Sequence, residues 1–357
     1  MFWVSLDGFE YSSSRYLSST ERLSISCIGR NPTRIKNIIE EANRRYGERT
    51  KSKTSIYRPR SSHRSMYMND MRWVPCTAKP QRPLSSVILD ERQKDSFVSD
   101  VQGYMRPSTI RWYSDRGIPY RRGYLFYGPP GTGKTSLCVA VAGHLGLSVY
   151  LLNLNSNNVD DDSLEILFDL LPKRCVILLE DVDTATVART RDNGNAVVDS
   201  ETGESAPADK RVSLSSLLNV IDGVAANEGR ILIMTTNYVE KLDPALKRPG
   251  RIDMCVKFGY CDKDALRNLF DSMYRDVGHG NGKDDSYSDI DSSENPVADE
   301  KKDHKRMVEI AADEFASLVP EGETTPASVQ GYLLRYKNDP KAAVEGVREW
   351  VAGLRAV

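Results

Sequence analysis

Apolar residues recur along the chain with two different spacings. From about Leu84 onward, short apolar runs alternate with longer segments in which apolar residues return every three or four positions. This alternation is typical of a parallel sheet whose strands are connected by helices. The runs predict five strands, at residues 123–127, 148–152, 175–179, 231–235 and 255–258. The connecting segments predict helices near residues 134–144, 162–171 and 213–221.

The first 83 residues have a different pattern. Residues 23–28 alternate between apolar and polar positions, as in a half-buried strand. The pair Asn31-Pro32 suits the start of a helix, and apolar residues on one helical face follow it. These residues are Ile35, Ile38, Ile39, Ala42 and Tyr46. Further β-like runs lie at residues 54–57, 65–68 and 72–76. Residues 1–83 are therefore predicted to form a small β-rich domain with one helix.

After Asp262 only helical patterns appear. The pairs Thr325-Pro326 and Asp339-Pro340 each combine a helix cap with a proline at the first helical position. An apolar helical face follows, made by Val344, Val347, Val351 and Leu354. We therefore expect three domains, a β-rich domain over 1–83, an α/β domain over 84–261 and a helical small domain over 262–357.

Two segments are too polar to bury much surface. Residues 184–209 are rich in Asn, Asp, Gly, Ser and Thr, and residues 278–303 are rich in Asp, Ser and Gly. Burial of so few apolar groups does not offset the entropy lost on ordering. Both segments are predicted to be solvated loop insertions, one in each of the last two domains.

Composition narrows the class of protein. The 357 residues include 49 Lys and Arg against 50 Asp and Glu, for a net charge of −1, which argues against a nucleic-acid binder. Residues 1–85 are locally basic, which would suit contact with anionic lipid, although a solvated face is the simpler interpretation. No apolar run is long enough to cross a membrane, and no signal peptide is evident. The 6 Cys and 4 His show no metal-ligand spacing, so the thiols are predicted to be reduced and scattered in the core.

The strongest motif is a phosphate-binding loop. The segment Gly-Pro-Pro-Gly-Thr-Gly-Lys-Thr over 128–135 lies between a predicted strand and a predicted helix, as this motif requires. Backbone N–H groups of such a loop converge on phosphate oxygens, the lysine bridges the β- and γ-phosphates, and the threonine hydroxyl binds Mg²⁺. We predict that nine residues bind the nucleotide: Gly128, Pro129, Pro130, Gly131, Thr132, Gly133, Lys134, Thr135 and Ser136.

Polar groups follow two other predicted strands. Glu180 and Asp181 end the run at 175–179, and Asn237 follows the run at 231–235. Ligands bind at the carboxyl edge of a parallel sheet, where a carboxylate can hold magnesium, another can polarise water, and an amide can orient that water. A plain surface turn is the alternative for each group.

Two arginines lie further along the chain. Arg248 and Arg251 are separated by Pro-Gly in a loop, and arginine forks can stabilise the charge that develops during phosphoryl transfer. Most surface arginines are simply solvated. Their position after the Asn237 motif favours the catalytic role.

These four motifs, in this order, resemble the AAA family of ATPases over about residues 84–357. Residues 116–131, 179–183 and 329–340 are similar to the mitochondrial chaperones of respiratory complex III assembly, and residues 23–46 resemble part of their N-terminal domain. The resemblance implies a P-loop core with a parallel five-stranded sheet, ATP and Mg²⁺ as cofactors, and a homo-oligomeric ring, heptameric in that family. It also implies that Asn237 is the sensor and that Arg248 and Arg251 reach a neighbouring subunit's site.

The same resemblance implies a cargo and a location. That family moves the folded Rieske iron–sulfur protein across the mitochondrial inner membrane, and no nucleic acid is involved. Its members carry a membrane helix before their specific domain, so membrane association would come only through a segment absent from this sequence. A soluble AAA remodelling ATPase with another protein cargo and a nucleotide-gated binding scaffold with negligible turnover are the alternatives.

Two features depart from the common AAA pattern. The carboxylates come as Glu180 then Asp181, the reverse of the usual order, and the chaperone family shares this reversal. We assign Glu180 to the magnesium together with Thr135, and Asp181 to the water. Because a displacement of about 1 Å can cost about a hundredfold in rate, the geometry must compensate for the shorter Asp side chain. Residues 153–162 contain no aromatic residue to grip an extended chain, which favours a folded cargo or a conformational switch.

Overall fold

The computed structural model describes residues 2–7, 22–28, 33–51, 53–62, 70–154, 159–183, 212–223, 227–275 and 296–354. The chain divides into two compact units, Met1–Lys53 and Thr54–Val357. In the first unit, β1 (Phe2–Asp7) pairs antiparallel with β2 (Arg22–Cys27), and α1 (Thr33–Lys51) follows. The strand predicted at 23–28 and the amphipathic helix are thus confirmed. The predicted cap Asn31-Pro32 lies outside the described residues.

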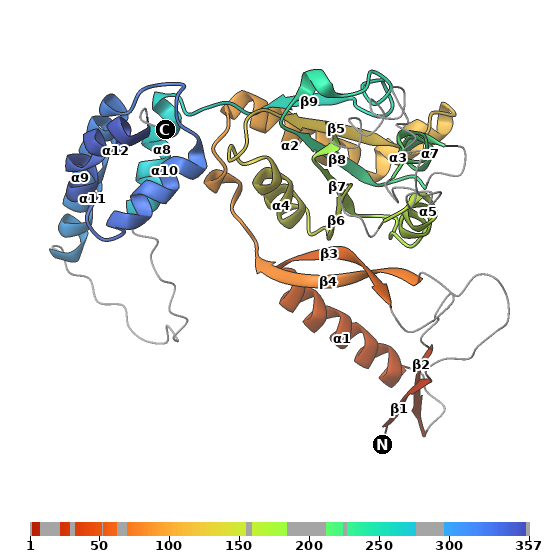
Figure 1. Ribbon diagram of the computed structural model, residues 1–357. Coiled ribbons are helices and arrows are strands. Elements are labelled where there is room, and N and C mark those ends of the chain that lie inside the picture. The colour runs from red at the N-terminus through yellow and green to blue at the C-terminus, as the bar shows by residue number, and fades with distance from the viewer. Residues whose placement is uncertain are drawn as a thin grey trace, which may run out of the picture. The chain divides into compact units, whose positions relative to one another are not determined.

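The second unit contains one sheet of seven strands in the order β4-β3-β6-β7-β8-β5-β9 (Figure 1). The five predicted strands are all present and parallel to their neighbours. They are β5 (Arg122–Tyr127), β6 (Val149–Asn153), β7 (Val176–Glu180), β8 (Ile231–Thr236) and β9 (Met254–Lys257). The predicted number of five strands is wrong, because β3 (Lys53–Ser62) and β4 (Asp70–Pro80) extend the same sheet.

The two additional strands are attached to the sheet by aromatic residues. β3 pairs parallel with β6, with Tyr57 opposite Tyr150, and these two rings stack at 4.7 Å between centroids. Trp73 of β4 meets the Tyr150 ring edge-on and donates its indole N–H to the carbonyl of Leu167 at 2.8 Å. The β-like runs predicted at 54–57 and 72–76 therefore belong to the large sheet. The run at 65–68 lies outside the described residues.

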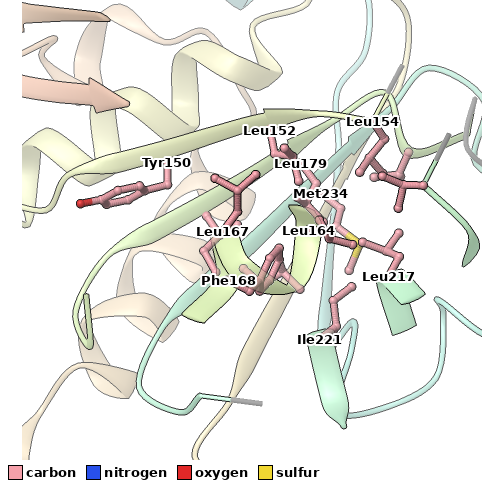
Figure 2. Close-up of a cluster of buried hydrophobic side chains, with 14 of the residues drawn as sticks. Tyr150, Leu152, Leu154, Leu164, Leu167, Phe168, Leu179, Leu217, Ile221 and Met234 are labelled. Carbon is pink, nitrogen blue, oxygen red and sulfur yellow. The ribbon is translucent and has the colours of Figure 1, made fainter. Parts of the chain in front are cut away.

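Helices cover both faces of this sheet and bury its apolar strands. On one face, α5 (Asp161–Asp169) and α7 (Leu214–Asp222) pack on β6, β7 and β8, and Figure 2 shows Leu164, Leu167 and Phe168 of α5 close to Leu179 and Met234 of the strands. On the other face lie α2 (Glu91–Tyr104) and α4 (Lys134–His144). The predicted helices near 134–144, 162–171 and 213–221 are confirmed. The remaining elements before β5 are η1 (Leu84–Ser86) and α3 (Pro107–Asp115), and η2 (Val239–Lys241) follows β8.

The C-terminal part is helical, as predicted, and has its own buried cluster. Its described elements are α8 (Lys263–Tyr274), α9 (Pro296–Leu318), α10 (Pro326–Leu333), η3 (Leu334–Tyr336), α11 (Pro340–Glu345) and α12 (Val347–Leu354). Two predictions need correction here. The apolar residues 344–354 do not share one helix, because Gly346 separates α11 from α12, and Leu354 is exposed. Residues 296–303 of the second polar segment are helical rather than a loop.

The first polar segment, 184–209, and residues 278–295 of the second lie outside the described residues. Among the described cysteines, Cys138, Cys175 and Cys261 are buried free thiols, which confirms the prediction of core thiols for these three. Burial raises the pKa of Cys175 and Cys261 to about 12, so both are protonated at neutral pH. Cys76 and Cys255 are exposed instead. Of the helices described, none combines the length and the apolar composition needed to cross a membrane.

Candidate functional site

The predicted phosphate-binding loop connects β5 to α4 at the carboxyl edge of the sheet. β5 ends at Tyr127 and α4 begins at Lys134, so Gly128 to Gly133 form the turn between them. Gly128 has a φ of 136°, and a Cβ there would lie 2.0 Å from the carbonyl oxygen of Phe258. Only glycine allows the loop to pass this close to the end of β9. Because α4 begins directly after the loop, the free N–H groups of its first turn face the loop, as anion binding requires.

The Lys134 ammonium lies at the centre of this loop and is 9% exposed. Its Nζ donates to the carbonyl oxygens of Gly128 at 2.7 Å and Pro129 at 2.8 Å, and to Asn237 Oδ1 at 2.8 Å. Burial lowers the pKa of Lys134, and the nearby carboxylates of Asp181 and Asp183 oppose that shift. A nearly buried cation that donates to three neutral oxygens can exchange some of them for phosphate oxygens.

A hydroxyl and a carboxylate meet beside the lysine. Thr135 Oγ1 donates to Glu180 Oε1 at 2.8 Å, which connects the first turn of α4 with the end of β7. The described residues contain no group of three or more His, Cys, Asp or Glu side chains suited to a metal. Mg²⁺ bound with phosphates keeps several waters and needs only one or two protein oxygens, so the Thr135–Glu180 pair fits that ion.

Asp181 occupies an unusual backbone conformation. Its φ of 53° is the only positive φ of a non-glycine residue among the described residues. The Asp181 N–H donates to Thr235 Oγ1 at 3.3 Å, and its Oδ1 lies 3.5 Å from Asn237 Nδ2. Left-handed backbone costs about 1–3 kcal/mol outside glycine, although Asp and Asn tolerate it better than most residues. The chain therefore bends sharply at the end of β7 and directs this short carboxylate toward Asn237.

The Asn237 amide contacts both Lys134 and Asp181. The buried carboxylate of Asp183 holds the turn that carries Asn237. Thr236 Oγ1 donates to Asp183 Oδ1 at 2.6 Å and accepts the N–H of Tyr238 at 3.0 Å. Asp183 is only 6% exposed. Because Asn237 lies between these two contacts, Asp183 acts as a positioning residue for its amide. Asp183 was not among the predicted site residues, since it lies two residues beyond the carboxylate pair and has no motif of its own.

These groups border one cavity of about 390 Å³, a volume within the usual range for small-molecule sites. Ten of the predicted residues line it: Pro130, Gly131, Thr132, Gly133, Lys134, Thr135, Ser136, Glu180, Asp181 and Asn237. Gly128, Pro129, Arg248 and Arg251 do not line it. Gly128 and Pro129 nevertheless contribute the carbonyl groups that hold Lys134.

Several lining residues that no sequence motif marks come from two other regions. Near η1 these are Arg82, Ser86, Val87 and Ile88, and at the start of α10 they are Pro326, Ala327 and Gln330. The Ala327 N–H donates to the Gly131 carbonyl at 3.1 Å, so the C-terminal helices contact the phosphate-binding loop directly. The pair Thr325-Pro326 had marked a helix start, but nothing in the sequence placed that start at the loop.

The two predicted catalytic arginines occupy different surroundings. Arg251 forms a two-pronged ion pair with Asp222, with N–O distances of 2.6 and 3.1 Å, and also donates to the Ala245 carbonyl. Arg248 is exposed. Because neither side chain lines the cavity of its own chain, the predicted action of both in a neighbouring subunit's site stays a prediction.

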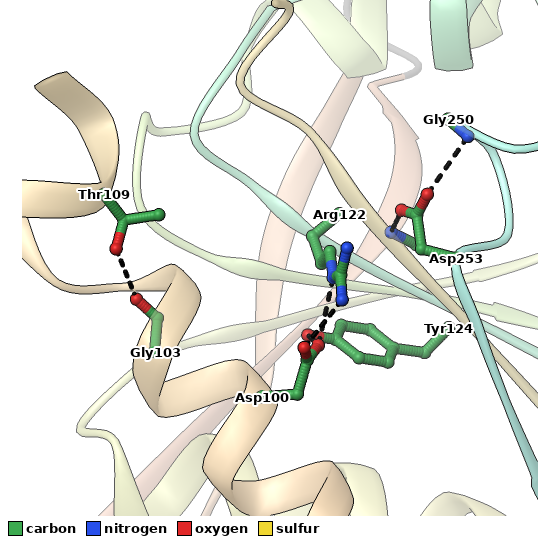
Figure 3. A network of polar contacts seen from close by, with 8 residues as sticks. Asp100, Gly103, Thr109, Arg122, Tyr124, Gly250 and Asp253 are labelled. Carbon is green, nitrogen blue, oxygen red and sulfur yellow. Dashed lines mark hydrogen bonds and ion pairs between the residues drawn. The ribbon is translucent and has the colours of Figure 1, made fainter. Parts of the chain in front are cut away.

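The arginine loop, residues 248–253, is fastened to the start of β5 (Figure 3). The Asp253 carboxylate accepts the N–H of Gly123 at 3.0 Å and of Gly250 at 3.1 Å. Arg122, directly before Gly123 at the start of β5, forms an ion pair of 2.6 Å with Asp100 of α2. Asp253 thus holds the arginine loop on β5, the strand that leads into the phosphate-binding loop, and the Arg122–Asp100 pair ties that strand to α2.

Three family models match the chain. The model described as ATPase family associated with various cellular activities (AAA) matches residues 124–260. The model for the BCS1 N terminal matches residues 1–87, and that for the mitochondrial chaperone BCS1-like ATPase lid domain matches residues 263–349. All four predicted motifs lie inside the matched ATPase region.

Curated relatives are similar over nearly the whole chain. Mitochondrial chaperone BCS1 of Homo sapiens is 37% identical over 327 residues, which are 91% of this chain and 67% of the relative. The protein of the same name in Danio rerio is 34% identical over 92% of this chain and 68% of its own length. Probable mitochondrial chaperone bcs1 of Schizosaccharomyces pombe is 35% identical over 92% of this chain and 62% of its own length.

Proposed function

The chain belongs to the BCS1-like chaperones of the AAA ATPase family, and from this premise we propose that it hydrolyses ATP with Mg²⁺ to move or remodel a protein client. The observation that carries the proposal is the convergence at one cavity of Lys134, the Thr135–Glu180 pair and the Asp181–Asn237 pair. Lys134 and Thr135 begin α4, Glu180 and Asp181 lie at the end of β7, and Asn237 follows β8. Each has the chemistry that one part of phosphoryl transfer needs.

The site residues have distinct proposed roles. Lys134 exchanges carbonyl contacts for the β- and γ-phosphates, and the Thr135 hydroxyl and Glu180 hold Mg²⁺, which neutralises charge on those phosphates when bound. Asp181 accepts a proton from the attacking water, and Asn237 orients that water from its position between Asp181 and Lys134. The bend at Asp181 is the feature that we propose compensates for the reversed carboxylate order.

The proposed client and location rest on the family resemblance. We propose that the client is a folded protein, with the Rieske iron–sulfur protein as the specific candidate, and that the chain acts at the mitochondrial inner membrane in complex III assembly. The relatives named mitochondrial chaperone support the mitochondrial location. We also propose a ring, heptameric as in that family, because Arg248 and Arg251 do not reach their own chain's cavity. Co-purification with the Rieske protein tests the client, and its absence would favour another cargo.

Separate measurements of nucleotide binding and phosphate release test the ATPase proposal. Lys134→Ala is expected to weaken Mg·ATP binding strongly, since the cation at the centre of the loop is lost. Asp181→Asn is expected to keep binding and to lower phosphate release at least about a hundredfold, because Asn tolerates the same backbone but cannot accept the proton. Lys173→Ala and Asp169→Asn, both at exposed positions outside the cavity, are the matched controls.

Two results would count against these roles. Normal hydrolysis by the Asp181→Asn variant would mean that another group activates the water. Tight ATP binding by the wild-type protein without any phosphate release, in any assembly state, would favour a nucleotide-gated scaffold over an enzyme.

A further inference from the structure

Arg82 connects two parts of the candidate site. Its Nε donates to Ser86 Oγ at 2.8 Å and its Nη2 to the Ser86 carbonyl at 3.1 Å. Its Nη1 donates to Ser136 Oγ at 3.0 Å. The guanidinium therefore spans from η1 to the first turn of α4 and borders the nucleotide cavity.

The Arg82 guanidinium has two N–H donors that these hydrogen bonds do not use. A guanidinium carries five N–H groups, and these three hydrogen bonds engage one on each nitrogen. One N–H on Nη1 and one on Nη2 thus have no acceptor among the residues that the structure describes. Free N–H groups of a guanidinium are the donors through which arginine binds phosphate oxygens.

The backbone around Arg82 is held in place before any ligand binds. Gln81 Nε2 donates to the Gly143 carbonyl at 2.9 Å, which fastens the preceding residue to α4. Pro83 follows, and its ring limits the backbone on the other side. The half-buried arginine is therefore preorganised, so little conformational entropy is lost when it contacts a phosphate.

The partners of Arg82 indicate which phosphate it faces. Lys134, Glu180, Asp181 and Asn237 mark the end of the cavity where the γ-phosphate and Mg²⁺ are expected. The hydrogen bonds of Arg82 go instead to Ser86 and Ser136, and Ser136 is one residue further along α4 than the Mg²⁺-side Thr135. In a P-loop the main-chain N–H groups on this side surround the α- and β-phosphates.

We infer that Arg82 is a further nucleotide-binding residue, which contacts the α-phosphate and so recognises ATP and ADP alike. This inference rests on the proposed nucleotide site and adds a cation from outside the P-loop motif. Its task is to anchor the part of the nucleotide that does not react, which leaves Lys134 and the magnesium pair free to follow the γ-phosphate.

Binding constants for Mg·ATP and Mg·ADP, measured by calorimetry on the full chain, test the inference. Arg82→Gln is expected to weaken both nucleotides by a similar factor of about ten to a hundred, the usual effect of losing hydrogen bonds to a charged group. The second readout uses ATP with sulfur on the α-phosphate. Wild-type protein is expected to prefer one of the two diastereomers, and the variant is expected to lose most of that preference.

Two control variants distinguish a direct contact between Arg82 and phosphate from a purely structural role of Arg82. Arg121→Gln alters another half-buried arginine, which donates to the Gly223 carbonyl and does not line the cavity, so it should leave both affinities and the diastereomer preference unchanged. Arg82→Lys keeps the charge without the fork and should recover only part of the affinity. Thermal unfolding of each nucleotide-free variant reports any loss of stability.

The inference is overturned if Arg82→Gln weakens ATP but not ADP, since that is the behaviour of a γ-phosphate contact. It is also overturned if affinities are unchanged, or if they fall while the diastereomer preference stays at the wild-type value. Failure of the wild-type protein to bind Mg·ATP would instead contradict the proposed function itself.

Discussion

Asp181 shows how one residue can adapt a familiar site. The reversed carboxylate order places the shorter side chain where we propose that the water is activated, so the geometry has to compensate for its length. In the structure the backbone at this residue is left-handed, with a φ of 53°, and the carboxylate faces Asn237. Asp tolerates left-handed backbone better than most residues, so the residue type suits the bend.

Gly123 must be glycine because the backbone of the arginine loop passes very close to it. A Cβ at this position would lie 1.8 Å from the Arg251 carbonyl oxygen, because the arginine loop crosses β5 there. Gly123→Ala is therefore expected to lower the free energy of unfolding by at least about 2 kcal/mol in chemical denaturation, since backbone must move on one side or the other.

Gly103→Ala provides the matched control for that substitution. Gly103 lies in α2, and nothing approaches within 4 Å of a Cβ built on it. Alanine should stabilise the helix there by about 0.5–1 kcal/mol. If Gly123→Ala were as stable as wild type, the packing of the arginine loop on β5 would be wrong.

At the scale of elements, β3 and β4 are the main difference between expectation and structure. Their short, mixed runs resemble those of a separate β-rich domain, yet they complete the sheet of the second unit. The reason is long-range contact. β3 pairs with β6, and Trp73 reaches across to α5, more than ninety residues away in the chain. Local periodicity cannot report such partners. The domain boundary at residue 83 stays a prediction.

Trp73→Phe tests whether β4 is part of the core sheet. The indole N–H caps the Leu167 carbonyl near the C-terminal end of α5, where helix carbonyls lack partners within the helix. Phenylalanine keeps an aromatic ring beside Tyr150 but leaves that carbonyl without the indole N–H. We expect a loss of about 1–2 kcal/mol in the free energy of unfolding, within a single transition.

Cys76→Ser, at an exposed position on the same strand, is the control and should change stability by less than about 0.5 kcal/mol. If Trp73→Phe altered only a separate minor transition, β4 would fold with the first unit instead.

At the scale of the whole molecule, the arginine loop is fixed in position but is absent from its own chain's cavity. Asp253 ties it to β5, and Asp222 holds Arg251, while Arg248 remains exposed. Such an arrangement suits a side chain that completes a site on another copy of the chain. It also agrees with family membership, since AAA proteins are commonly oligomeric.

Mixing two inactive variants tests this arrangement. Arg248→Ala and Lys134→Ala should each lose hydrolysis alone, yet a co-expressed mixture should recover up to about a quarter of wild-type phosphate release. That is the share of interfaces in a random ring that combine an intact loop with an intact neighbouring arginine. Lys134→Ala mixed with Glu180→Gln is the control, because both residues serve the same chain's site and no recovery is expected. Persistent inactivity of the first mixture, despite co-purification, would contradict action between subunits.

The local pattern of the sequence was sufficient to predict the phosphate-binding loop, the five central strands, the helical C-terminal part and the family. These features depend on residues close together in the chain, whose spacing alone is restrictive. Only the tertiary structure brought Arg82, Asp183 and Ala327 to the site, joined β3 and β4 to the sheet, and paired Arg251 with Asp222. Each of those contacts joins residues that are distant in sequence or lack a motif, and burial and hydrogen bonding in the folded chain select their partners.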